Sequence, residues 1–330
     1  MTHDEIKTLL HTSSYDFLRT HKNLNDNIIL LGLGGSHAYG LSTPTSDLDV
    51  RGIATRTADD ILLGNDFGTF TNTATDTVIH SFDKALSMLA ESNPNSMELL
   101  GLDPEDYLYV SEYGQMILDN KQAFLSKKCI RPFSGYINQQ LYRLRQKSLC
   151  AMSEEEYLAH IVTVLNDMCE PFNQKHETDI ELSVKNLDIV LNGHFEDLSL
   201  ETLMDILSQI NTTYREYKKR SKRNEHAIAH NKIAKHCSSL LNVYIMGLDI
   251  LKKQEIITKR KEERQLLMDI KSGKYLAEDG KPNQEFFDIV TDYEKQFKEA
   301  IASTKLPDEP DYKTIEAIKI NVNKEIISSH

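Results

Sequence analysis

Residues 32–49 read GLGGSHAYGLSTPTSDLD, and they follow an apolar run from Ile28 to Leu31. A short apolar run that ends in glycine is typical of a buried strand. Gly35 allows a tight turn after this strand, because glycine adopts backbone conformations that other residues avoid. Backbone N–H groups and the Ser36 hydroxyl would then lie at the start of a helix, where phosphate groups bind well. The stretch therefore predicts a strand, a turn and a phosphate-binding helix start.

Two aspartates, Asp47 and Asp49, follow Ser36 after ten intervening residues. Alternation over residues 47–55, DLDVRGIAT, favours a second strand, and residues at i and i+2 of a strand project from the same face. Paired carboxylates suit Mg²⁺, a hard cation that prefers oxygen ligands and keeps substrate phosphates in its coordination shell. Together the two features predict a site for metal-assisted transfer of a nucleotide.

The bulk composition is typical of a soluble globular protein. The chain has 330 residues, of which 40% are hydrophobic and 27% are charged, enough to form two modest domains or one large one. The formal net charge of −12 argues against a general nucleic-acid binder, since phosphate binding needs clustered Lys and Arg. No apolar run approaches the roughly 20 residues that span a bilayer, and the polar N-terminus does not resemble a secretory signal.

The cysteines are scattered and form no CxxC pair: Cys129, Cys150, Cys169 and Cys237. This spacing argues against zinc ligation. We expect reduced thiols, a cytoplasmic location and no membrane partner.

The first third of the chain reads as a small α/β domain. Hydrophobic spacing predicts helices over residues 4–20 and 83–91, a short helix that begins at His37, and a helix capped by Ser96 after the break at Asn93-Pro94. Alternating or β-branched runs predict strands over 27–33, 47–55 and 75–82.

The remainder has the spacing of helices. The predicted helices cover 131–149, 154–168, 200–220, 226–252, 260–271 and 284–303. Residues 170–200 are less regular and contain a turn signal at Asn192-Gly193. We therefore predict an α+β protein with a catalytic domain over about 1–110 and a mainly helical domain over 111–330, which completes the cleft for nucleotide and acceptor.

One pattern resembles the signature of the polymerase-beta nucleotidyltransferase superfamily: Gly35-Ser36, followed after ten residues by Asp47-Leu48-Asp49. The resemblance implies a third carboxylate on a neighbouring strand, for which Asp76 of TDTVIHSF is the candidate. Asp83 lies seven residues later, where the strand gives way to a helix, and it reads better as the cap of that helix.

A narrower resemblance covers most of the chain except residues 151–210. The stretches GSHAYGLSTPTSDLDVRG, DTVIHSFDKALSMLAESNPNSMELL, KIAKHCSSLLNVYIMGLDIL, QLLMDIKSGKY and LPDEPDY are similar to predicted nucleotidyltransferases of the RNA-ligase-associated and YcgL-like family. The resemblance implies a Mg²⁺- or Mn²⁺-dependent enzyme that transfers a nucleoside monophosphate from an NTP and releases pyrophosphate. Asp47, Asp49 and Asp76 would hold the metal ions, and Gly35 and Ser36 would bind the triphosphate.

A basic stretch stands out in this acidic chain. Residues 214–264 carry fourteen Lys or Arg against six Asp or Glu, with KKRSKR (218–223) as the densest run. Such a run is either a solvated helix face or a wall that binds a triphosphate or an RNA backbone. Lys232 and Lys235 share one helix face with His236, so they are candidates to contact the β- and γ-phosphates. The alternative is that the aliphatic part of each lysine is buried while its ammonium group remains in water.

Several other residues have two interpretations. His37 is either a capping or packing residue or a phosphate contact. Arg51, two residues past Asp49, either contacts a phosphate or forms a structural ion pair. Glu98 reads as a first-turn acid of a helix. The apolar residues of the later family-like helix read as core: Leu240, Leu241, Tyr244, Leu248 and Leu251.

The sequence leaves other functions open. A non-catalytic nucleotide-binding regulator or an antitoxin-like partner module with the same fold is the alternative to an enzyme. For an enzyme, the acceptor is an RNA end, a protein hydroxyl or a small molecule, and no residue chooses among them or among the NTPs, because acceptor choice resides in loops and in the helical domain.

Overall fold

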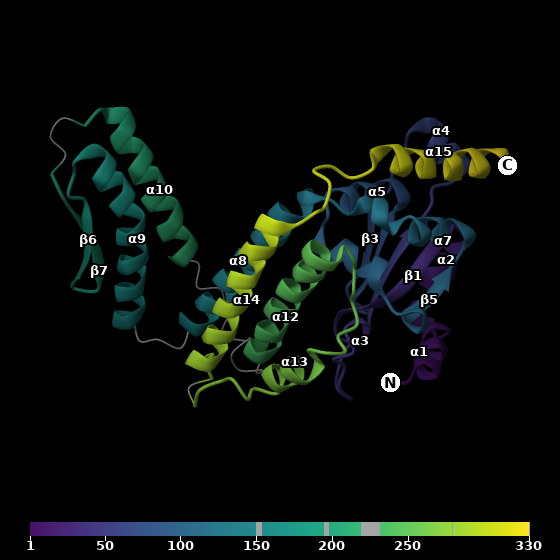
Figure 1. Ribbon diagram of the computed structural model, residues 1–330, viewed down its shortest axis with the longest axis horizontal. Helices are drawn as coiled ribbons and strands as arrows, with labels where there is room; N and C mark the ends of the chain where they lie inside the picture. The colour runs from purple at the N-terminus through teal and green to yellow at the C-terminus, as the bar shows by residue number, and fades with distance from the viewer. Residues whose placement is uncertain (150–153, 195–197, 219–231, 279, 330) are drawn as a thin grey trace. The chain divides into compact units, whose positions relative to one another are not determined.

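The computed structural model describes residues 1–330 except 150–153, 195–197, 219–231, 279 and 330 (Figure 1). The chain forms two compact units. The first comprises Met1–Gln139, Ser238–Lys274 and Glu285–His330, and the second comprises Gln140–Cys237 and Tyr275–Gln284. The predicted division into a catalytic and a helical domain at residue 110 is a statement about function and stays a prediction.

A mixed five-stranded sheet forms the centre of the first unit, and helices make up most of the later chain, which confirms the predicted α+β class. The strand order is β3-β4-β2-β1-β5. The strands are β1 (Ile28–Gly34), β2 (Asp49–Ala54), β3 (Thr69–Asn72), β4 (Thr77–Ser81) and β5 (Tyr107–Val110). Strands β2 and β4 are parallel, whereas the other neighbours are antiparallel.

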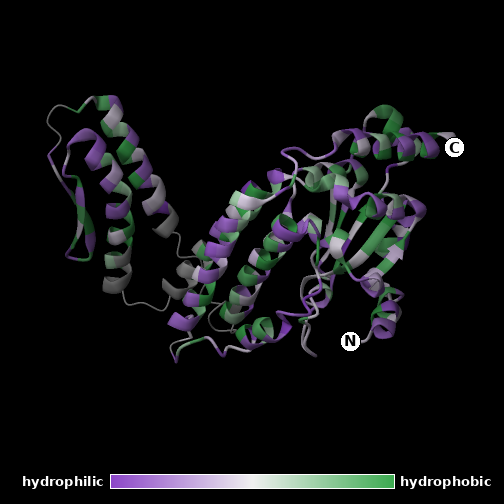
Figure 2. Ribbon diagram, viewed as in Figure 1, coloured by the Kyte–Doolittle hydropathy of each residue, from purple (hydrophilic) through white to green (hydrophobic). Residues whose placement is uncertain are grey.

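Strand β1 is the most deeply buried strand. All seven of its residues are buried, and Figure 2 shows it as a continuous hydrophobic segment. It is hydrogen-bonded on both sides, to β2 and to β5, so an apolar run with no polar alternation is the expected sequence for this position. The predicted strand over 27–33 is confirmed.

The predicted N-terminal helix over 4–20 is wrong as a single element. The segment divides into α1 (His3–Leu10), the 3₁₀ turn η1 (Ser13–Tyr15) and α2 (Phe17–Thr20). The Thr12 hydroxyl donates to the carbonyl of Leu9 at 2.7 Å. Ser and Thr side chains compete in this way with the helical hydrogen bonds, and they interrupt the helix between Leu10 and Phe17.

Short helices surround the sheet: α3 (Gly35–Ala38), α4 (Ala58–Leu63), α5 (Phe82–Ala90), α6 (Pro94–Met97) and α7 (Glu112–Asp119), with 3₁₀ turns η2 (Asn25–Asn27), η3 (Glu98–Gly101), η4 (Pro104–Asp106), η5 (Lys121–Phe124) and η6 (Lys127–Cys129).

Two predicted caps are wrong. The Ser81 hydroxyl, not Asp83, accepts from the first turn of α5. Asn93, not Ser96, caps α6, because Pro94 already occupies the first helical position.

The remaining helices are α8 (Ile130–Leu149), α12 (Lys232–Leu248), which continues as the π-helical turn η7 (Asp249–Lys253), α13 (Arg264–Lys271), α14 (Gln284–Ser303) and α15 (Tyr312–Ser328). The predicted core residues of α12 and η7 are confirmed as buried: Leu240, Leu241, Tyr244, Leu248 and Leu251. Among the described residues, no helix combines the length and the apolar character needed to cross a bilayer.

The second unit contains a hairpin between two helices, α9 (Glu154–His176), β6 (Glu181–Lys185), β7 (Asp188–Asn192) and α10 (Leu200–Lys218). The hairpin turns at Asn186-Leu187, where both φ values are positive, and not at the predicted Asn192-Gly193, since Asn192 still pairs with Glu181. Asn166 and Asn173 of α9 exchange side-chain hydrogen bonds with the backbone of residues 180–182, which satisfies one edge of β6.

Candidate nucleotide and metal site

The predicted acids lie where β1 ends and where β2 and β4 begin. Asp49 is the first residue of β2 and pairs with Gly34, the last residue of β1. Asp76 directly precedes β4, whose Thr77 is paired with Val50 in parallel register. Because parallel strands begin at the same edge of a sheet, Asp49 and Asp76 lie on neighbouring strands at one edge.

Asp47 occupies a different position from the one predicted. It precedes β2 in an exposed loop, so it is not on the strand face of Asp49. The pairing of β1 with β2 stops at Gly34 and Asp49, so Asp47 lies outside the ladder. Asp47 nevertheless lies two residues before Asp49, near the same edge of the sheet.

The two glycines each make room for a different side chain. Gly35 has a φ of +55°, and a Cβ added there would lie 2.9 Å from Cγ of Asp49 and in collision with its Oδ2 atom. A Cβ on Gly34 would lie 2.9 Å from Cγ of Arg51. Real Cβ atoms do not pack this closely, so alanine fits at neither position without a shift of the neighbours. Gly34 and Gly35 therefore allow the side chains of Asp49 and Arg51 to pack closely against the end of β1.

Ser36 lies in α3, a helix of one turn. Its carbonyl accepts from the amide of Leu41 at 2.8 Å, which closes the loop that follows. The predicted helix that begins at His37 is wrong: α3 runs from Gly35 to Ala38.

The ligand atoms of the three acids do not all lie within 4.8 Å of one another. Asp49 is ion-paired with Arg51, with 3.1 Å between Oδ1 and Nη2. Asp47 and Asp76 are exposed. In the part of the chain that the structure describes, the group whose ligand atoms all lie within 4.8 Å of one another is a different one, composed of His3, Glu105 and Asp106.

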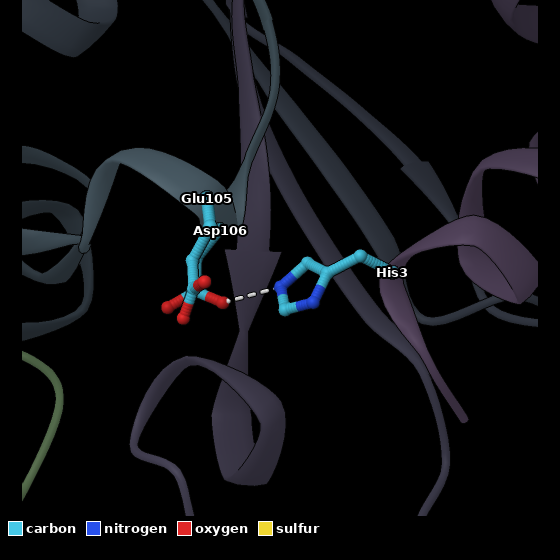
Figure 3. Close-up of side chains that lie close together, drawn as sticks. All are labelled: His3, Glu105 and Asp106. Atoms are coloured by element: carbon cyan, nitrogen blue, oxygen red, sulfur yellow. Dashed lines mark hydrogen bonds and ion pairs between the residues drawn. The ribbon is translucent and has the colours of Figure 1, made fainter.

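Figure 3 shows these three side chains pointing toward one another. His3 Nε2 and Asp106 Oδ1 are 2.9 Å apart. The ammonium of Lys259 lies 2.5 Å from Glu105 and 3.2 Å from Asp106, and this charge lowers the pKa of Glu105 through its hydrogen bond. Lys259 already pairs with both carboxylates, so the cluster is better explained as an ion-pair network than as a metal site.

Residues 260–271 hold the loop after Ser36 through hydrogen bonds to three consecutive backbone carbonyls. The amide of Arg260 donates to Tyr39 at 3.1 Å. The Arg264 side chain donates to Gly40 at 3.0 Å, and the Lys271 ammonium donates to Leu41 at 2.6 Å. The contacts join residues more than 200 positions apart, all within the first unit. They fix the loop between the Gly-Ser turn and the aspartates.

Tyr39 of this loop and Glu98 form a half-buried pair. The Tyr39 hydroxyl donates to a carboxylate oxygen of Glu98. Burial raises the pKa of Glu98 to about 7, while the hydrogen bond and the charge of Arg51 act in the opposite direction. Burial and the adjacent carboxylate also raise the pKa of Tyr39. Glu98 is therefore more than the first-turn acid that the sequence suggests.

Arg260 lies beside this pair. Its guanidinium donates to Asp249 at 2.5 Å and to Asn242 at 2.8 Å, and it is 2% exposed. A charge this deeply buried requires such partners. Asp249 belongs to the π-helical turn η7, so the irregular turn supplies the counter-ion.

His37 and Tyr15 lie close enough to the acids for the carboxylate charges to shift their pKa values. His37 is buried, as its packing interpretation expects. Burial lowers its pKa, and a hydrogen bond to the Ser46 backbone and the charge of Asp49 partly offset this shift. Burial, together with the charges of Asp76 and Asp49, raises the pKa of Tyr15. The N-terminal segment thus contributes an aromatic hydroxyl near both acids, which the sequence reading did not anticipate.

Asp83 lies at the opposite end of β4 from Asp76. It pairs with Arg56 at 2.6 Å and with Lys319 at 3.1 Å. These contacts tie α5 to the residues after β2 and to α15, so Asp83 has a structural role.

The predicted phosphate-binding lysines belong to the second unit. Lys232 begins α12, and its side chain lies outside the described residues. Lys235 is exposed. Residues 219–223 of the basic run also lie outside the described part. A position of either lysine opposite the aspartates therefore stays a prediction.

Residues 10–161 match the sequence profile of the RNA repair pathway DNA polymerase beta family. The match supports a polymerase-beta-like nucleotidyltransferase family for this part of the chain. A curated relative, an uncharacterized 38.9 kDa protein in the nrdC-mobD intergenic region of Enterobacteria phage T4, is 24% identical over 301 residues, which cover 78% of this chain and 85% of that protein. No solved structure matches the chain significantly. The polymerase-beta-like segment contains the Gly-Ser turn and all three candidate acids.

Proposed function

We propose that this polymerase-beta-like protein is a Mg²⁺- or Mn²⁺-dependent nucleotidyltransferase that moves a nucleoside monophosphate from an NTP to an acceptor and releases pyrophosphate. The observation that carries the proposal is the place of Asp49 and Asp76 at one edge of two parallel strands, beside the Gly34-Gly35 turn.

The donor set fits a divalent ion of this kind. Asp47, Asp49 and Asp76 offer hard carboxylate oxygens, and two of these residues are exposed, as expected for ligands that share an ion with a substrate. A bound divalent ion would supply positive charge to stabilise the oxygens of the transferred phosphoryl group. Asp76 would also accept the proton of the attacking acceptor hydroxyl.

Gly35 and Ser36 would bind the triphosphate through backbone N–H groups and the serine hydroxyl. The contacts of Arg260, Arg264 and Lys271 with residues 39–41 support this role, because they hold the loop without using the Gly35 and Ser36 groups. Lys232 and Lys235 would add positive charge near the β- and γ-phosphates.

An RNA end is the acceptor that we favour. The support is the description of the matching family, which names an RNA repair pathway, together with the basic stretch over residues 214–264. Lys and Arg in such a stretch bind a phosphate backbone by releasing its counterions.

Incubation of the full chain with each labelled NTP and Mg²⁺, with and without cellular RNA, tests the proposal. We expect label in the RNA fraction and free pyrophosphate. Label on the protein or on a small molecule would identify that molecule as the acceptor in place of RNA and would leave the proposed reaction unchanged. Binding of NTP without turnover under all conditions would contradict the enzyme and support the non-catalytic regulator.

A further inference from the structure

Arg51 reaches across three neighbouring strands at the edge where the acids lie. Its stem lies over Gly34 of β1, where a Cβ would come within 2.9 Å of Cγ. Nη2 donates to the Asp49 carboxylate at 3.1 Å, and Nη1 donates to the carbonyls of Val50 at 3.0 Å and Asp76 at 2.5 Å. One guanidinium therefore joins the second acid to the backbone of the third.

The Asp76 turn needs such support. Asp76 has a φ of +43°, in the left-handed region that few residues with a side chain adopt and that aspartate tolerates better than most. Its carbonyl accepts from both the Val50 amide, at 3.3 Å, and Arg51. Residues 73–76 form a largely exposed turn before β4, so these two donors on β2 add to the strand pairing that begins at Thr77 in holding the turn near Asp49.

Arginine suits this position better than any other cation. Its planar fork can donate in several directions at once, whereas the ammonium of lysine is a single point of charge on a flexible stem. Here two nitrogens of one fork serve a carboxylate and two carbonyls. The fork therefore adds side-chain hydrogen bonds between Asp49 and the Asp76 turn to the backbone pairing of β2 with β4.

We infer that Arg51 is a positioning residue of the transfer site: it fixes the turn of Asp76 against β2, so that the third acid is aligned with Asp49 before a divalent ion binds. The inference rests on the proposed function, because Asp76 matters only if it serves the transferred phosphoryl group. Arg51 needs no contact with a substrate for this role.

A matched arginine lies at the other end of the same strands. Arg56 donates to the carbonyl of Asn65 at 2.8 Å and to the Asp83 carboxylate at 2.6 Å. It makes the same two kinds of contact as Arg51, away from the acids. Arg56→Lys is therefore the control for the loss of an arginine fork.

The first measurement is amide hydrogen exchange of the full chain without metal or nucleotide. Arg51→Lys keeps the charge and loses the fork, so exchange in residues 73–78 should rise about tenfold, the effect of a lost charge-assisted hydrogen bond. Arg56→Lys should leave this segment unchanged. Gly34→Ala, which displaces the arginine stem and keeps its charge, should raise exchange in the same segment, and it serves if Arg51→Lys does not fold.

The second measurement is turnover with saturating Mg²⁺ and NTP. We expect Arg51→Lys to lower kcat roughly tenfold with KM for NTP unchanged, and to have little further effect in an Asp76→Ala background. Unchanged exchange in residues 73–78, or an equal loss in both backgrounds, would overturn the inference while the wild-type enzyme stays active. A wild-type protein without transfer activity would instead contradict the proposed function, and the inference would fall with it.

Discussion

The carboxylate of Asp49 lies against the α-carbon of Gly35, at a distance that leaves no room for a Cβ. The contact explains why a glycine precedes Ser36, since any side chain at position 35 would push the carboxylate off the edge of the sheet. It also links the two halves of the signature, which are separated by ten residues of sequence.

We predict that Gly35→Ala lowers transfer roughly a hundredfold, because a displaced acid misaligns the reacting groups. The positive φ of +55° adds a folding cost of about 1 kcal/mol. Gly64→Ala is the matched control: its φ is +73°, and no described atom lies within 4 Å of the added Cβ. Both variants should lose similar stability in thermal unfolding. Equal activity of the two variants would show that the Asp49 contact is unimportant.

We predict that Asp76 serves the transfer reaction, whereas Asp83 stabilises the fold. Asp76→Asn should lower the transfer rate roughly a thousandfold, to a residual rate that can still be measured, and should leave the melting temperature near that of the wild type, because the side chain is exposed. Asp83→Asn should destabilise the fold by about 2 kcal/mol, since Arg56 and Lys319 lose their common partner. Kinetic assays and thermal unfolding of both variants check this division. A reversed pattern, with Asp83 essential for turnover, would refute the choice of Asp76.

The raised pKa of the half-buried Glu98 predicts a pH dependence of stability. Its pKa is about 7 in the folded protein against an ordinary value of 4.5, so the folded state binds the proton more tightly. The free energy of unfolding should therefore fall as the pH rises from about 4.5 to 7, through this group alone. Glu98→Gln should remove that part of the slope, measured as the difference between the two proteins in urea unfolding at several pH values. Parallel curves would show that Glu98 does not titrate in this range.

The lysines of α12 are predicted to bind the outgoing phosphates. Replacement of both Lys232 and Lys235 with Gln should raise KM for NTP and leave binding of a nucleoside monophosphate nearly unchanged, because that ligand lacks the β- and γ-phosphates. The effect should weaken as salt screens the charges. Lys298→Gln, at an exposed lysine paired with Glu294, is the control. Equal losses for monophosphate and triphosphate would return this helix to its interpretation as a solvated face.

Local patterns in the sequence predict the strands well and their exact ends poorly. The apolar run before Gly34 and the β-branched run of β4 are local signals, and both strands are present. Asp47 was placed on β2, but the strand begins at Asp49 because β1 ends at its partner, Gly34. The length of a strand depends on its neighbour, which local alternation does not show.

Contacts between residues that are distant in the sequence are the second feature that local patterns do not predict. Nothing in QLLMDIKSGKY indicates that the Lys271 side chain binds the carbonyl of Leu41. The short strands β3 and β5 have four residues each, too few for a clear alternation. The missed helix α15 did carry a signal, because its buried residues have helical spacing: Ile315, Ile318 and Val322.

The most direct test of the account compares transfer from NTP labelled at the α-phosphate with transfer from NTP labelled at the γ-phosphate, for the wild type and for Asp49→Asn, with Mg²⁺ and RNA present. We predict that only the α-label reaches the acceptor, and that Asp49→Asn loses more than about a thousandfold in rate, or roughly 4 kcal/mol of transition-state stabilisation, while it folds normally. Transfer of the γ-label would indicate phosphoryl rather than nucleotidyl transfer. A wild-type rate in Asp49→Asn would contradict the assignment of this edge of the sheet as the active site.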